Sequence, residues 1–304
     1  LAKGSKNKLT ASVDRRAPGI HCGEGTELVI DDDIPNVTAA GDPIAMNPSK
    51  YPGRIPSGTS FVGNDGTTHT AGTSKGDDRL SLLESTEPGS LEVTGDMNHA
   101  AIGSVNFENA GTMTFNGGII TATTRGGGND WGFGAAIGGG AAGSGGTMIF
   151  NGGTIETWTS YHGASIGGGA WASNQRVYTD SSYLFKDSID NGIVMTAEGG
   201  PNTVAPESKT CAGDIYVNGG VLRPHGDAHG NAIGQGCCSW NKGHEIVIAG
   251  GTVLPDSSRA VEKGGDPRVK CVSMGIGAQD GAVHVIGGSV RIGHVDATNS
   301  DELF

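Results

Sequence analysis

One strand-like phrase occurs five times in the chain, and this repetition constrains the fold more than any other feature. The copies are TMTFNGG from Thr112, TMIFNGG from Thr147, DIYVNGG from Asp214, EIVIAGG from Glu245 and AVHVIGG from Ala282. Apolar and polar residues alternate within a copy, which is typical of a short strand, and the glycine pair indicates a turn. The chain is therefore predicted to be built from repeated units.

A second phrase follows each of the first four copies. It reads GAAIGGG from Gly134, GASIGGG from Gly163, GNAIGQG from Gly230 and SMGIGAQ from Ser273, and HAAIG from His99 opens the series. The glycine pairs are spaced by 35, 67, 31 and 37 residues, so the second interval is about twice the others. We expect that an insertion masks one copy there, with IVMTAEGG from Ile193 as its degenerate strand.

A period of this length also occurs in helical repeat proteins, but a glycine-rich sequence argues against helices. Glycine occupies 55 of 304 positions, and each interior helical glycine costs about 1 kcal/mol relative to alanine. The remaining prediction is an all-β parallel solenoid, in which each period is one coil and equivalent residues stack about 4.8 Å apart. In this alignment Asn116, Asn151 and Asn218 form one column. The phrase isoleucines Ile137, Ile166 and Ile233 are expected to be buried.

Two regions depart from the repeat. Residues 1–90 contain seven of the twelve prolines and neither phrase, so we expect irregular N-terminal coils that act as a cap. Residues 91–304 form the repeat-built part. Within it, residues from about 170 to 210 are expected to contain a long loop insertion beside the masked copy.

Charge and composition narrow the range of partners. The formal net charge of −12 disfavours binding to nucleic acid or to anionic lipid. The longest uncharged run, 131–155, contains too many Gly, Ser, Thr and Asn residues to cross a bilayer.

Five cysteines without a CxxC pair favour one or two disulfides over structural zinc, and we expect Cys211 to lie about one coil from Cys237 or Cys238. We expect a mature secreted fragment, located outside the cell or on its surface.

Aromatic residues are scarce, and most of the large ones fall between the strand phrases. Flat aromatic faces beside carboxylates suit the CH faces and hydroxyls of sugars, although packing under loops is the alternative. The candidate glycan-binding residues are Trp131, Trp158, Tyr161, Trp171, His225 and Trp240. Candidate catalytic carboxylates are Asp130, Glu156 and Asp227, because glycoside hydrolysis needs two carboxylates about 5 to 9 Å apart. Turn formation is the alternative role for these acids.

The stretch RPHGDAHG from Arg223 places His225, Asp227 and His229 at alternate positions. In an extended backbone these three side chains would point to the same face, where they could bind a metal ion. However, His229 precedes Ile233 by four residues, as His162 precedes Ile166 and Phe133 precedes Ile137. We therefore assign His229 to a scaffold column and predict no metal site. His225 and Asp227 are placed in the linking turn. The acidic run 31–33 is compatible with calcium, but no calcium motif supports it, and we expect no cofactor.

With its FNGGTI and GAAIGGG phrases, the chain resembles the secreted right-handed parallel β-helix proteins of bacteria, the broad pectate-lyase-like class. The resemblance covers about residues 91–292. It implies a right-handed β-helix and a carbohydrate-active or adhesin-type protein that binds a glycan and can hydrolyse it. The calcium and arginine motifs of the lyases find no match here, which favours a glycoside hydrolase over a lyase. The alternative is a structural or adhesive surface protein whose solenoid self-associates through its ends without catalysis.

Overall fold

The computed structural model describes residues 1–2, 4–11, 17–32, 60–64, 66–70, 88–96, 98–125, 132–159, 162–170, 211–226, 230–236, 244–255, 275–277 and 281–290. These residues form strands, turns and bends. None of them belongs to a helix, so this part of the chain has no helix that could span a membrane. The all-β prediction is confirmed.

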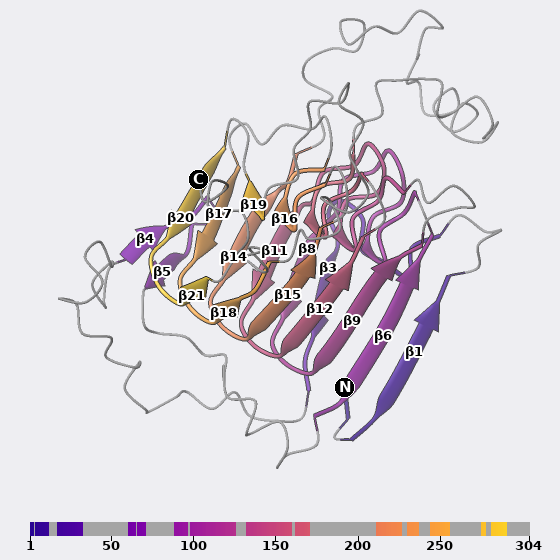
Figure 1. Ribbon diagram of the computed structural model, residues 1–304, viewed down its shortest axis with the longest axis horizontal. Helices are drawn as coiled ribbons and strands as arrows, with labels where there is room; N and C mark the ends of the chain where they lie inside the picture. The colour runs from indigo at the N-terminus through magenta and orange to yellow at the C-terminus, as the bar shows by residue number, and fades with distance from the viewer. Residues whose placement is uncertain are drawn as a thin grey trace, which may run out of the picture.

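Three parallel sheets run along the molecule (Figure 1). Sheet 1 contains β1 (Lys6–Thr10), β6 (Ser90–Gly95), β9 (Ile119–Thr124), β12 (Thr154–Trp158), β15 (Val221–His225), β18 (Thr252–Val253) and β21 (Ser289–Val290). Sheet 2 contains β2 (Ile20–His21), β7 (Ile102–Gly103), β10 (Ile137–Gly138), β13 (Ile166–Gly167), β16 (Ile233–Gly234) and β19 (Ile276–Gly277). Sheet 3 contains β3 (Glu27–Ile30), β8 (Thr112–Phe115), β11 (Thr147–Phe150), β14 (Asp214–Val217), β17 (Glu245–Ile248) and β20 (Ala282–Val285).

One strand from each sheet makes one coil, and the chain visits the sheets in the same order every time. The five copies of the first phrase are β8, β11, β14, β17 and β20, which pair in register as neighbours in sheet 3. The isoleucine of the second phrase begins each strand of sheet 2 from β7 onward. The protein is therefore a right-handed parallel β-helix, as predicted, with one repeat per coil.

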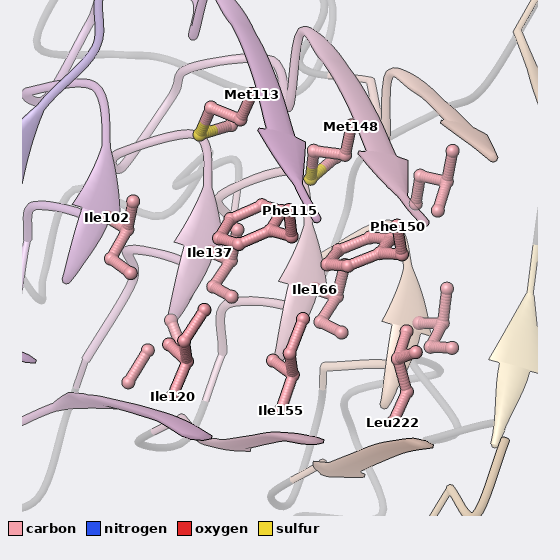
Figure 2. Packing of buried hydrophobic residues seen from close by; sticks show 14 of the residues in the cluster. Ile102, Met113, Phe115, Ile120, Ile137, Met148, Phe150, Ile155, Ile166 and Leu222 are labelled. Atoms are coloured by element: carbon pink, nitrogen blue, oxygen red, sulfur yellow. The ribbon is translucent and has the colours of Figure 1, made fainter. Parts of the chain in front are cut away.

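Stacked apolar columns fill the interior, as Figure 2 shows for the isoleucine, methionine and phenylalanine rows. Ile137, Ile166 and Ile233 are 0% exposed, which confirms the repeat alignment. The rings of Phe115 and Phe150 stack with centroids 4.9 Å apart, close to the distance between adjacent strands. The same residue type recurs along a column because each interior side chain packs against the equivalent side chain of the next coil.

The predicted asparagine column is also present. Asn151 donates from Nδ2 to Asn116 Oδ1 at 3.0 Å, and Asn218 donates from Nδ2 to Asn151 Oδ1 at 2.9 Å. Asn116 in turn lies 3.4 Å from Asp31 Oδ2, so an aspartate begins the ladder in the first coil. These side-chain hydrogen bonds satisfy polar groups at the corner where the chain leaves sheet 3.

The expectation of a masked coil between residues 170 and 210 is wrong. Strand β12 pairs directly with β15, β11 with β14 and β13 with β16, all in parallel register. No coil therefore lies between them, and the doubled spacing of the glycine pairs reflects an insertion alone. The phrase IVMTAEGG, which was expected to be the strand of the masked coil, lies outside the described residues.

Residues 1–90 contribute more regular structure than their sequence suggests. They supply β1, β2 and β3, which form the first coil and pair with β6, β7 and β8. They also supply an antiparallel hairpin, β4 (Ser60–Val62) and β5 (Thr68–Thr70). Figure 1 shows the hairpin beside the C-terminal strands of sheet 3, far along the solenoid from the first coil.

A Trp–His–Glu cluster on sheet 1 as the candidate functional site

Strands β12 and β15 carry three of the predicted site residues on the outer face of sheet 1. Ile155 and Leu222 point into the core and are 0% exposed, so the alternate residues of both strands point outward. The register pairs Trp158 with His225, and Glu156 with Arg223. Residues distant in sequence are thus neighbours because the insertion adds no coil.

The Trp158 and His225 rings stack almost parallel, with centroids 3.6 Å apart and an interplanar angle of 3°. His225 Nε2 lies 3.2 Å from Glu156 Oε1, and only 16% of the His225 side chain is exposed. One face of Trp158 is thereby covered. Thr123 of β9 is the register partner of Trp158 in the preceding coil, on the side opposite to His225.

Trp158 and His225 were expected in linking segments, and that expectation is wrong, since each is the last residue of a strand. The strand that follows the glycine pair is longer than the sequence suggested, since β12 continues to Trp158 and β15 to His225. The other predicted site residues lie outside the described residues; they are Asp130, Trp131, Tyr161, Trp171, Asp227 and Trp240. His229 and the cysteines at 237 and 238 lie there too.

The stacking of Phe133 on His162 supports the scaffold column. Their ring centroids are 4.8 Å apart with an interplanar angle of 10°, and both residues are buried. Both precede the isoleucine of sheet 2 by four residues. A histidine at this position is therefore part of the packing, as the alignment predicted for His162.

Among the described strands, one other carboxylate lies in the same outward-facing column of sheet 1 as Glu156. Glu92 of β6 is two coils away, with Thr121 of β9 between the two glutamates. Two strand spacings give roughly 10 Å between their backbones. Glu92 is 2.5 Å from Lys8 Nζ, and its side chain is 49% exposed. The two acids thus lie on the outer face of sheet 1 with partly exposed side chains, each beside a basic partner.

A second polar cluster, which the sequence analysis missed, lies on the outer side of sheet 3. His244 Nδ1 is 3.4 Å from Asp214 Oδ2. Asp214 Oδ1 accepts hydrogen bonds from the Glu245 N–H and from Asn64 Nδ2, both at 3.0 Å. Glu245 Oε1 accepts from Tyr216 Oη at 2.9 Å and from the Asn64 N–H at 2.5 Å. The turn of the β4–β5 hairpin is thereby fastened to β14 and β17.

One signal in the sequence pointed to this cluster. Asp214 and Glu245 occupy the same position of two adjacent repeat copies, so the alignment stacks two carboxylates. Like charges at this distance require donors from elsewhere in the chain. The partner, Asn64, lies in a region without repeats, which is why no pattern identified it.

The cluster shifts two pKa values. Two contacts raise the pKa of His244 to about 10, first the contact with the Asp214 carboxylate and then the contact with the Cys211 side chain. Burial acts in the opposite direction. Burial acts to raise the pKa of Asp214, but hydrogen bonds, first from His244 and then from Asn64, hold it below its usual value. At neutral pH the pair is therefore an imidazolium beside a carboxylate.

We expect this pair to make stability depend on pH in the alkaline range. The folded-state pKa of His244 is raised from 6.5 to about 10, so its contribution is complete below pH 6.5 and is lost as the pH rises toward 10. Because the pair is partly exposed, the contribution should be about 1 kcal/mol. Urea unfolding of the wild type and of His244→Gln at pH 6 and pH 10 measures it. A difference between the two proteins that is the same at both pH values would contradict the assignment.

Within the described residues, no group of three or more His, Cys, Asp or Glu side chains is arranged to hold a metal ion. No family model matches the chain, and no curated protein or solved structure matches it either.

Proposed function

We propose that the protein is a surface or secreted glycan-binding β-helix, and that its ligand binds on the outer face of sheet 1. The observation that carries the proposal is the Trp158–His225–Glu156 cluster. A tryptophan, an imidazole and a carboxylate on one rigid surface provide an apolar ring beside hydrogen-bonding groups, which is the combination that sugars require.

The geometry also suggests where the sugar lies. His225 covers one face of Trp158, so a sugar that packs on the indole must approach from the β9 side, over Thr121 and Thr123. Both threonines point outward and are partly exposed. Their hydroxyls can exchange hydrogen bonds with sugar hydroxyls, because a hydroxyl both donates and accepts.

We favour binding over hydrolysis. A glycosidase needs one carboxylic acid to give a proton to the leaving group and a second carboxylate close enough to act with it. Glu156 and Glu92 are two coils apart, and each is engaged by a basic side chain. The resemblance to secreted bacterial β-helix proteins is compatible with either activity.

A glycan array followed by titration of the best ligand tests the proposal. We expect Trp158→Ala to weaken binding about tenfold or more, because the indole supplies most of the apolar contact. Val29→Ala is the matched control, since Val29 is a 61% exposed apolar residue on sheet 3. Unfolding curves of both variants show whether the fold is intact.

Two results would overturn the proposal: no glycan bound by the wild type, or equal affinity of the wild type and a folded Trp158→Ala. The same samples, assayed for new reducing ends, separate binding from hydrolysis. We expect no cleavage.

A further inference from the structure

Arg223 lies beside the cluster and carries a charge that no contact with a described residue neutralises. It lies in β15 on the outer face of sheet 1, where it registers with Glu156, two residues before His225, which registers with Trp158. Its Nε is buried and has no hydrogen-bond partner. Within the part of the chain that the structure describes, its guanidinium takes part in no ion pair.

The stack of Trp158 and His225 explains why Glu156 does not neutralise this arginine. Glu156 is the register partner of Arg223, and adjacent strands lie about 4.8 Å apart, so an ion pair would be within reach. The stack instead holds the imidazole edge so that His225 Nε2 faces Glu156 Oε1. Glu156 is thereby engaged by the imidazole, and no ion pair joins it to Arg223 within the described residues.

An unpaired arginine of this kind requires an explanation. Folded proteins satisfy most buried polar groups, and the exceptions concentrate at sites that bind or react. The Nε of Arg223 is buried and unpartnered, and the residue as a whole is partly exposed, so a ligand can reach its terminal nitrogens from the outer face of sheet 1. A planar guanidinium with its outer N–H groups exposed matches an oxyanion with two acceptor oxygens.

We infer that Arg223 is the anion-recognition residue of the glycan site, and that the ligand carries a carboxylate or a sulfate ester. The inference rests on the proposed glycan-binding function and specifies its substrate class. The chain has a net charge of −12, so attraction of a polyanion by the protein as a whole is disfavoured. A preference for an acidic glycan must therefore come from a local site.

Three polysaccharides distinguish the ligand chemistry: alginate carries carboxylates, dextran sulfate carries sulfate esters, and dextran is neutral. We expect the wild type to bind one or both acidic polymers more tightly than dextran. Arg223→Gln should lower that affinity about tenfold or more, because it removes a charge-assisted contact. Lys6→Gln is the control for the loss of one positive charge, since Lys6 is exposed on β1, four strands away from β15 in sheet 1.

Glu156→Gln provides a test with the opposite sign. It removes the negative charge beside Arg223 and keeps the shape of the side chain, so it should raise the affinity for the acidic polymer severalfold. A purely structural role of Arg223 would not produce this increase. Equal affinity of Arg223→Gln and wild type, or weaker binding by Glu156→Gln, would overturn the inference.

The outcomes also separate this inference from the proposed function. If dextran binds as well as the acidic polymers, and Trp158→Ala weakens binding whereas Arg223→Gln does not, the glycan site stands and the anion preference is wrong. If the wild type binds none of the three polymers and nothing on the glycan array, both are wrong.

Discussion

Ile166→Asp should unfold the protein or lower its stability by several kcal/mol. Ile166 is 0% exposed in sheet 2, between Ile137 and Ile233 of the adjacent coils. An aspartate there would place a charge in an apolar interior with no partner within reach, and such burial is strongly unfavourable. Urea unfolding followed by circular dichroism measures the loss.

Ile166→Val is the control for this prediction. It keeps the apolar character and removes one methylene group, so it should cost only about 1 kcal/mol. The comparison separates the effect of charge from that of lost volume. If Ile166→Asp were as stable as Ile166→Val, the isoleucine column would not be the interior of a solenoid.

Gly167→Ala should destabilise the protein by about 3 kcal/mol or more, although it adds a single methyl group. Gly167 has a φ of 138°, and a Cβ at this position would lie 1.8 Å from the carbonyl oxygen of Gly234. That oxygen belongs to the backbone of the next coil and accepts a hydrogen bond from the Gly168 N–H. The coils must therefore separate to admit the methyl group.

Gly25→Ala separates close approach from backbone strain. Gly25 also has a positive φ of 76°, but a Cβ there would meet nothing within 4 Å. Its substitution should cost only the conformational strain, about 1 kcal/mol. Thermal unfolding of the two variants compares the effects. Equal losses would show that the distance between coils is not what requires glycine at 167.

Much of the fold was predictable because stacking makes the sequence repeat. Each coil places its strand residues over those of the previous coil, so the phrases ending in Gly118 and Gly153 recur with the same alternation. The first coil escaped detection for a local reason. ELVI from Glu27 resembles EIVI from Glu245, but three aspartates follow it and the glycine pair is missing. Asp31 takes the asparagine position of the phrase and accepts the ladder hydrogen bond from Asn116.

The candidate site was predictable only in part. Residue type identified Trp158, Glu156 and His225, but only the register showed that they meet, because 66 residues separate Trp158 from His225 along the chain. Arg223 gave no signal, since an arginine at an outward strand position is ordinary. Arg223 is of interest because its Nε is buried without a hydrogen-bond partner, which only the three-dimensional structure shows.

The most direct test of the account is to locate the bound glycan by hydrogen–deuterium exchange. With a ligand from the glycan array present at saturation, the account predicts slower exchange in peptides that contain β12 and β15. Peptides from β3 and β8 on sheet 3 should exchange at the same rate with and without the ligand. Protection confined to sheet 3, or binding without protection of β12 and β15, would contradict the assignment of the site to the Trp158–His225–Glu156 cluster.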